Sequence, residues 1–330
     1  MWRLAFRLTV SVALIAIVVS LVDLRVLATN LARIQLPWLV LAAALIWSTT
    51  FVSAWRWSIV IRSFGPQRER SPSYWHLWLL YWIGQFFNQL LPSGLGGDGM
   101  RMWLVRRAGL PTGSAITSVL VDRVVALTAI VLLVAATLPF AFSGPGQDTA
   151  PLWLWGVVFS CSLGIAVVAG FAGAPLPDRI SGNPLVRALR RLSTDLWKVM
   201  SRPGYLLATL GASIVVQVIG SFAVYSIAQS LGVRLELLQC VALMPVVVLA
   251  TAVPISIAGW GVREVAMVAV LASVGVARED ALLISVLYGG LAVATSLPGG
   301  VLWLLERRAE SSAAETNLPA SHNQAPDAAE

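Results

Sequence analysis

Two apolar stretches of the chain, 74–112 and 238–277, are each interrupted by a motif with the same spacing. The motif reads Pro, four residues, Gly, one residue, Gly, one residue, Arg. Pro and Gly disfavour helix, and non-helical backbone at membrane depth survives only inside protein or beside a wet cavity. Paired interruptions in two halves of a membrane protein point to a substrate site between them. The matching positions are Pro92, Gly97, Gly99 and Arg101 in the first copy, and Pro254, Gly259, Gly261 and Arg263 in the second.

The composition indicates that these motifs lie within a membrane. Hydrophobic residues make up 58% of the 330-residue chain and charged residues 12%, about half the charged share of a soluble domain. Apolar runs of about 20 residues mark helices that cross the bilayer. We therefore predict an all-α, polytopic transmembrane helical bundle with two broken, re-entrant helical hairpins at the interrupted stretches. Uninterrupted apolar runs lie at 5–22, 37–61, 113–142, 152–173, 204–231 and 281–305.

The distribution of positive charge predicts the orientation. With the N-terminus in the cytoplasm, 15 of the 23 Lys and Arg residues fall in inner segments and four in outer segments. Cytoplasmic loops carry this excess in membrane proteins. The first hairpin then enters from the cytoplasm and the second from outside, so the halves 37–142 and 204–305 form an inverted repeat. The same charge bias would result if each interrupted stretch crossed the membrane twice, so both arrangements stay open.

Two segments lie outside the repeat halves. In the cytoplasmic connector 174–203, residues 185–200 alternate apolar side chains with Arg at helical spacing, which predicts an amphipathic helix on the inner leaflet. Residues 309–330 have no apolar period, so we expect a disordered cytoplasmic tail. Residues 1–308 are then one transmembrane domain, with both chain ends in the cytoplasm.

Six ionisable residues fall at or near membrane depth, where a charge costs about 2.5–3.5 kcal/mol even on the lenient insertion scale. They should therefore face the bundle interior and pair. Asp98 with Arg123, and Asp122 with Arg101, is one neutral arrangement. The residues are interpreted either as buried ion pairs that hold a hairpin in place or as groups that bind substrate. The six are Asp98, Arg101, Asp122, Arg123, Arg263 and Glu264.

The two motif arginines suggest an anionic ligand. Each follows its Gly-x-Gly break, so each is expected in the first turn of a half-helix, whose N-terminus presents free N–H groups. Asn88 and Gln89 precede the first motif and either bond the freed backbone or line a cavity. Arg56 lies between two Trp residues near a span end and is expected to extend to the interface.

The sequence offers little for catalysis. It has no nucleotide-binding loop, no Ser/His/Asp set and no metal-ligand spacing, and its two cysteines stand apart in apolar segments. We therefore expect no catalytic residue, no metal and no cofactor. The positive charges are spread over loops, which gives no indication of nucleic-acid binding.

Four segments together resemble the lysylphosphatidylglycerol synthase transmembrane-region family, and the resemblance covers nearly all of 5–308. They are Asn88-Gln-Leu-Leu-Pro-Ser-Gly-Leu-Gly-Gly-Asp-Gly-Met-Arg101, Val121-Asp-Arg123, the run Pro254 to Glu264, and Leu297-Pro-Gly-Gly300. In its best-known members the family's membrane region is a lipid flippase, fused there to a soluble aminoacyltransferase. This chain ends soon after its last span, so the resemblance implies the flippase-like part alone. By the family pattern, the six ionisable residues lie in a central cavity.

These observations predict a flippase-like protein of the bacterial inner membrane that translocates an anionic lipid or lipid-linked head group. Two alternatives stay open. One is a membrane-embedded transferase that acts on a lipid-phosphate donor and uses Asp98 or Glu264 as its base. The other is a non-transporting partner of a lipid-modifying enzyme, which would dock on the connector.

Overall fold

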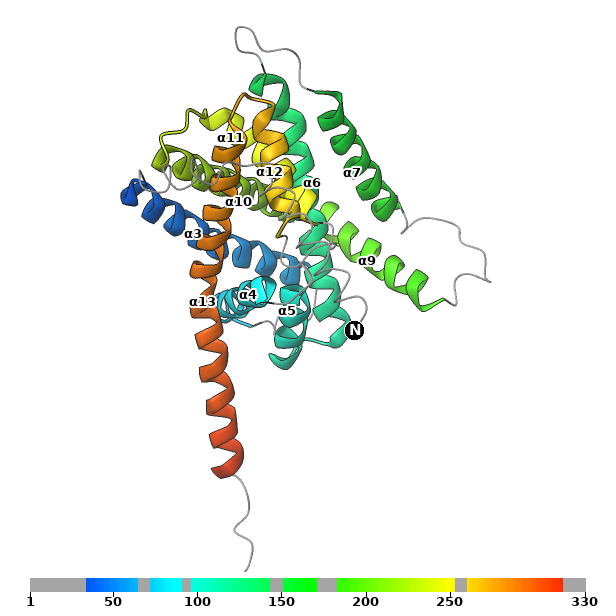
Figure 1. The fold of residues 1–330 in the computed structure, drawn as a ribbon. Helices are drawn as coiled ribbons and strands as arrows, with labels where there is room; N and C mark the ends of the chain where they lie inside the picture. The colour runs from blue at the N-terminus through cyan, green and yellow to red at the C-terminus, as the bar shows by residue number, and fades with distance from the viewer. Residues whose placement is uncertain are drawn as a thin grey trace, which may run out of the picture.

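The structure is a computed structural model, and it describes residues 34–64, 72–90, 96–142, 151–170, 183–252 and 260–316. All regular elements in these ranges are α-helices (Figure 1). The all-α class predicted from the sequence is therefore confirmed for the described ranges. The predicted span 5–22 and the motif residues Pro92, Pro254 and Gly259 lie outside them.

Five helices are long and apolar enough to cross a membrane. Helices α3 and α10 both have Pro in their first turn, where the missing N–H would have no partner within the helix. All five match apolar runs identified in the sequence. They are α3 (Leu36–Ser63), α6 (Thr112–Ala141), α7 (Leu152–Gly170), α10 (Pro203–Ser230) and α13 (Arg278–Thr316).

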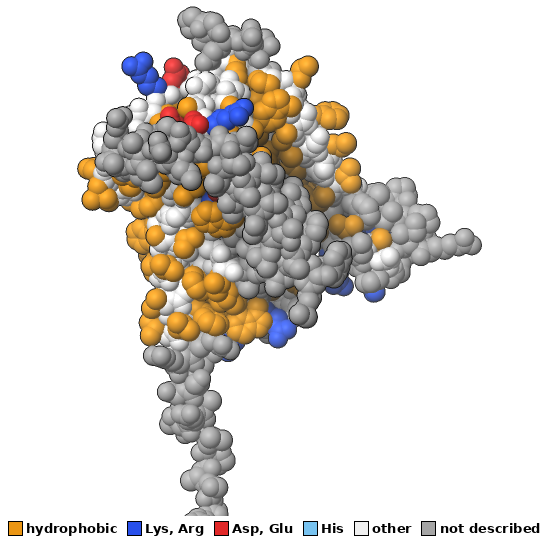
Figure 2. Space-filling model, viewed as in Figure 1, with side chains coloured by type: hydrophobic (Ala, Val, Ile, Leu, Met, Phe, Trp, Pro, Cys, Tyr) orange, Lys and Arg blue, Asp and Glu red, His pale blue; other side chains and the backbone are white. Residues whose placement is uncertain are grey.

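The surface of these helices fits a lipid environment. On the face seen in Figure 2, hydrophobic side chains cover much of the described flank of the body, and charged side chains lie toward its ends. Large apolar side chains such as Phe159 in α7 and Leu207 in α10 are 70% and 71% exposed. Such exposure is unfavourable in water and favourable against acyl chains.

Each interrupted stretch forms two shorter helices, as predicted. They are α4 (Tyr74–Leu90) with α5 (Gly96–Arg107), and α11 (Leu237–Ala252) with α12 (Val262–Ala272). At 1.5 Å per residue, α5 and α12 are about 18 and 17 Å long, shorter than the hydrocarbon layer of about 30 Å. His76 of α4 and Arg107 of α5 line one small cavity, so the first hairpin begins and ends at the same end of the molecule. Its re-entrant course in a bilayer stays a prediction.

The two sets of four helices pack reciprocally. Helices α3 and α10, which begin the repeat halves, pack together, and the Gln35 N–H donates to the Ser230 carbonyl at 3.0 Å. Helix α4 packs on α13 just as the corresponding α11 packs on α6, and α3 contacts α13 as α10 contacts α6. This is the pattern expected of a two-fold relation between the halves, which itself stays a prediction. The opposite orientation of the halves in the membrane stays a prediction.

Helix α9 (Pro184–Met200) forms where the amphipathic helix was predicted. Its apolar side chains pack against α3 and α6, with Leu196 beside Val60 and Val121. Ser193 and Trp197 both donate to the carbonyl of Ala169, at 2.9 and 2.8 Å, near the end of α7. Helix α9 therefore joins the peripheral α7 to the bundle.

Helix α13 is the longest element and lies along the whole bundle (Figure 1). It continues to Thr316, so helix extends into the segment expected to be a disordered tail, and residues 317–330 lie outside the described ranges. Gly299 lets α13 approach α4 closely, because a Cβ there would lie 2.5 Å from the Trp82 carbonyl oxygen. The Trp82 indole N–H donates to the Thr295 carbonyl at 2.9 Å beside this contact.

Candidate functional site

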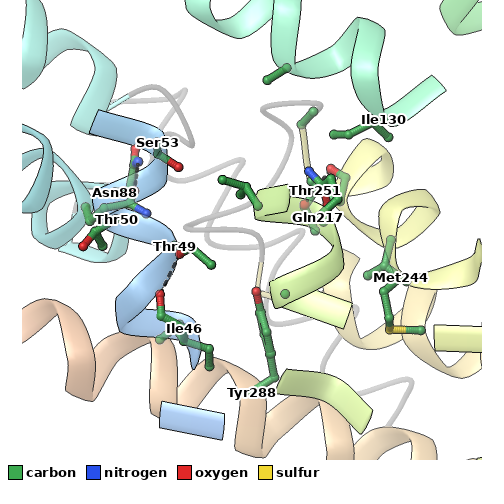
Figure 3. A pocket seen from close by; sticks show the side chains of 18 of the residues that line it. Ile46, Thr49, Thr50, Ser53, Asn88, Ile130, Gln217, Met244, Thr251 and Tyr288 are labelled. Carbon is green, nitrogen blue, oxygen red and sulfur yellow. Dashed lines mark hydrogen bonds between the residues drawn. The ribbon is translucent and has the colours of Figure 1, made fainter. Parts of the chain in front are cut away.

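A cavity of about 390 Å³ is lined by both repeat halves. The middle of each of four long helices lines it: Thr50 in α3, Leu127 in α6, Gln217 in α10 and Ala292 in α13. Since these helices are long enough to cross the bilayer, their midpoints place the cavity near half its depth. Figure 3 shows Thr49 on α3 facing Gln217 across the space, with Tyr288 of α13 pointing between them. The volume falls within the range of about 300–1,000 Å³ typical of small-molecule sites.

Five charged side chains of the first half form a continuous chain of ion pairs beside this cavity. Arg56 Nε and Nη2 donate to the two carboxylate oxygens of Asp122 at 2.7 and 3.2 Å. Arg101 Nη2 donates to Asp122 at 3.0 Å, and its Nη1 donates to Asp98 at 3.4 Å. Arg123 Nε donates to the other oxygen of Asp98 at 2.5 Å. The predicted cross-pairing of Asp98 with Arg123 and of Asp122 with Arg101 is confirmed.

The expectation that Arg56 extends to the membrane interface is wrong. Its side chain is only 7% exposed, and its Nη1 donates to the Ser213 hydroxyl of α10 at 3.2 Å. The bidentate pair with Asp122 supplies two charge-assisted hydrogen bonds inside the bundle. The neighbouring Trp57, which suggested an interface, is fully buried and donates to Ser118 at 3.2 Å.

Arg101 lies between two aromatic rings. Its guanidinium carbon is 4.3 Å from the ring centre of Trp57 and 4.5 Å from that of Tyr81, within the range of cation–π attraction. Gly84 makes room for the side chain, because a Cβ there would lie 2.6 Å from Arg101 Cγ. The buried Nε of Arg101 has no hydrogen-bond partner among the described residues. Arg101 is thus held on several sides and keeps one donor unused.

Arg263 lines the same cavity from the second half. Its Nε and Nη2 donate to Glu264 Oε1 at 3.1 and 2.7 Å, and Ser285 lies 3.3 Å from Nε. The guanidinium carbon lies 4.5 Å from the ring centre of Trp260. Gly289 of α13 leaves space for this group, because a Cβ there would lie 2.1 Å from Nη2. Van der Waals contact with α13 therefore helps to fix the position of Arg263.

The starts of the two half-helices carry the chain's own carboxylates. Glu264 Oε2 accepts a hydrogen bond from the Gly261 N–H at 2.5 Å at the start of α12, and Asp98 lies in the first turn of α5. These carboxylates offset the positive ends of the helix dipoles. The chain's own carboxylates thus offset part of the positive charge at the two helix N-termini, and arginine side chains supply further positive charge at the cavity. The attraction of an anion by the helix N-termini stays a prediction.

The two motif copies also differ in where the helix resumes. Arg263 lies in the first turn of α12, as expected. Helix α5 already begins at Gly96, so Arg101 lies in its second turn, and Gly97 and Gly99 lie within the helix rather than in the break. Gly261 does lie at the break, with a φ of +86° that favours glycine.

Asn88 and Gln89 divide the two roles predicted for them. Asn88 Oδ1 accepts a hydrogen bond from the Gly97 N–H at 2.9 Å, so Asn88 bonds backbone freed by the break. Gln89 lines the cavity, and its buried Oε1 has no hydrogen-bond partner among the described residues. The Ser221 hydroxyl of α10, which no sequence pattern indicated, also lines the cavity and has no hydrogen-bond partner among the described residues.

The cavity wall is basic. Arg56, Arg101, Arg123 and Arg263 line it, and Asp122 is the one carboxylate among the described lining residues. Asp98 and Glu264 lie behind the arginines as their ion-pair partners. Four arginines and three carboxylates give this group a formal net charge of +1.

Comparison with known proteins adds one finding. A family model described as the lysylphosphatidylglycerol synthase TM region matches residues 4–299. The matched range contains both hairpins and all the residues that line the cavity. Among the curated proteins compared with the chain, none matches it.

Proposed function

The chain belongs to the lysylphosphatidylglycerol synthase transmembrane-region family, and from this premise we propose that it translocates an anionic lipid head group between membrane leaflets. It is a multi-pass integral membrane protein with five helices long enough to cross a bilayer. We further propose the bacterial inner membrane as its location, with both termini in the cytoplasm. The observation that carries the proposal is that Arg101 and Arg263, from opposite halves, line one cavity, which the midpoints of four membrane-length helices also line.

Translocation requires a polar path for the head group through an apolar layer. The cavity supplies hydrogen-bonding groups at the depth where the hydrocarbon supplies none. The four arginines of its wall and the three carboxylates paired with them carry a formal net charge of +1, which a single phosphodiester would neutralise. A neutral or cationic head group would leave the buried positive charge uncompensated, which is unfavourable in a low-dielectric site.

The pairing of the carboxylates favours translocation over transferase chemistry. A general base must be within hydrogen-bond reach of the proton that it removes. Asp98, Asp122 and Glu264 each accept hydrogen bonds from arginine side chains. Asp98 and Glu264, the two candidates for a base, also lie behind the cavity wall.

Transport by the purified full-length protein in liposomes tests the proposal. The measured quantity is the rate at which acyl-labelled phosphatidylglycerol of the inner leaflet becomes accessible to an impermeant quencher. Protein-containing vesicles should exchange the label much faster than protein-free vesicles. Equal rates in the two would overturn translocation and favour the non-transporting partner.

A matched pair of glycine variants tests the role of Arg263. A Cβ in Gly289→Ala would lie 2.1 Å from Arg263 Nη2, whereas at Gly290 a Cβ meets no atom within 4 Å. We expect Gly289→Ala to displace the flexible guanidinium and slow transport about tenfold, the effect of a loss of about 1.4 kcal/mol. Gly290→Ala should keep the wild-type rate. Equal rates for the two variants, both folded by thermal melting, would remove Arg263 from the site.

A further inference from the structure

The cavity has a second set of polar groups, and these are uncharged. Six side chains that line it make no hydrogen bond to any described residue: Ser53, Tyr81, Gln89, Gln217, Ser221 and Tyr288. They come from α3, α4, α10 and α13, so they surround the space from both halves. In Figure 3, Gln217 and Tyr288 point into the cavity opposite Ser53.

Two of these groups are buried acceptors without a partner. Gln89 Oε1 and Ser221 Oγ have almost no solvent contact and no hydrogen bond within the described ranges. A buried polar atom left unpaired costs about 1–3 kcal/mol. Hydroxyl groups on a ligand can donate to these atoms and accept from the amide N–H groups of Gln217 and the hydroxyl of Tyr288.

Among the residues that the structure describes, no carboxylate is placed to receive an ammonium group. Asp122 lines the cavity but already accepts hydrogen bonds from Arg56 and Arg101, and Asp98 and Glu264 stand behind arginines. An ammonium in the cavity would face four arginine side chains. Like charges in a low-dielectric site repel strongly.

We propose that the head group which this cavity takes is one phosphate joined to an uncharged, hydroxyl-bearing group, a polyol or a sugar, and that ammonium-bearing head groups are rejected. This inference rests on the proposed function, since it defines the substrate class of the same site. The phosphate pairs with Arg101 and Arg263, and the hydroxyl groups bond Gln89, Gln217, Ser221 and Tyr288. A site built to bond ligand hydroxyls rejects analogues without them, because its own buried groups are then left unpaired.

Three probe lipids with identical labelled acyl chains test the substrate class in the proteoliposome assay. Phosphatidylglycerol carries a phosphate and two hydroxyls, phosphatidic acid carries a phosphate alone, and phosphatidylethanolamine carries an ammonium. Phosphatidylglycerol should move at least about tenfold faster than phosphatidylethanolamine, and faster than phosphatidic acid. Equal rates for all three, or the fastest rate for phosphatidylethanolamine, would overturn the inference while leaving translocation intact.

A variant of Gln217 separates hydroxyl recognition from charge recognition. Gln217→Leu keeps the size of the side chain and removes its hydrogen bonds, so it should slow phosphatidylglycerol about tenfold and leave phosphatidic acid within about twofold. Val218→Leu is the control, because Val218 lies next in α10 and does not line the cavity. An equal loss for both lipids in Gln217→Leu would mean that Gln217 does not recognise hydroxyl groups.

A binding measurement distinguishes failure of this inference from failure of the proposed function. Short-chain forms of the three lipids are added to the full-length protein in detergent, and the shift in thermal unfolding temperature is measured. If no lipid moves in vesicles but phosphatidylglycerol alone raises the unfolding temperature, translocation is overturned and the ligand class stands. If no lipid moves and none stabilises the protein selectively, both proposals fall.

Discussion

Asp122 is the central residue of the ion-pair chain, because it joins arginines from two other helices to α6. Its oxygens accept from Arg56 of α3 and Arg101 of α5, and its side chain is 2% exposed. The sequence predicted the partner of Arg101 because every buried charge at membrane depth needs an opposite charge. It did not predict the partner of Arg56, which lies 66 residues away, because flanking Trp residues occur both at membrane interfaces and in protein interiors.

Replacement of Asp122 should destabilise the fold strongly. Asp122→Asn leaves two buried arginines without their shared counter-charge, and loss of one partner of a buried ion pair costs about 3–5 kcal/mol. The measurement is the free energy of unfolding by titration with denaturing detergent in mixed micelles. Asp195→Asn is the control, because its partner Lys198 is 45% exposed and such surface pairs contribute about 0.5 kcal/mol or less. A similar effect for the two variants would contradict a structural role for the buried chain.

At the scale of elements, the first hairpin shows what a glycine motif can and cannot predict. The spacing correctly placed a break between α4 and α5 and another between α11 and α12. It could not place the residue at which helix resumes, because glycine is permissive both in a break and in a helix. Gly97 is instead required for packing: a Cβ there would lie 2.1 Å from the Gly84 carbonyl oxygen of α4. That contact depends on tertiary structure and left no separate signal in the sequence.

Alanine at Gly97 should therefore separate the two arms of the hairpin. The clash is with backbone, which cannot move aside as a flexible side chain can, so Gly97→Ala should destabilise the protein by about 1–3 kcal/mol. Gly99→Ala is the matched control, because a Cβ at Gly99 meets no atom within 4 Å and alanine favours helix by up to about 1 kcal/mol. Thermal melting in detergent should show a lower midpoint for the first variant only. A midpoint that falls equally for Gly99→Ala would argue against the close contact.

At the scale of the whole molecule, the reciprocal packing places the cavity between the two halves. Each half alone presents only part of the cavity wall, since α3 and α6 line one part and α10 and α13 the other. The sequence predicted this central site from the pairing of two interrupted stretches. It did not predict the uncharged set around Gln217, because an isolated Gln or Ser in an apolar helix carries no distinguishing pattern.

Cysteine labelling of intact cells tests the inverted orientation. In a background with Cys161 and Cys240 replaced by Ala, Ala108→Cys at the end of α5 should react from the cytoplasm only. Ala277→Cys, just before α13, should react with an impermeant maleimide from outside. Labelling of both from one side would reject the inverted repeat.

The same assay separates a re-entrant hairpin from two full crossings. Leu90 is the last residue of α4, so a re-entrant course keeps Leu90→Cys away from the outer surface. We expect no reaction of Leu90→Cys with the impermeant reagent from outside, whereas Ala277→Cys in the same cells provides the positive control. Reaction of Leu90→Cys from outside would show that the first interrupted stretch crosses completely.

In the proposed cycle, the surplus of one arginine over the carboxylates predicts that transport is sensitive to membrane voltage. A unit charge moved across the whole bilayer changes in energy by about 2.3 kcal/mol for every 100 mV. When a monovalent anion is bound, the group of four arginines and three carboxylates at the cavity is electrically neutral. In the proposed cycle, the step that carries the bound anion across the membrane therefore does no electrical work. Without a bound anion, the same group keeps its positive charge and is attracted toward the negatively charged interior of the cell. We therefore expect an imposed potassium diffusion potential to change the return of the unloaded protein more than the passage of its cargo.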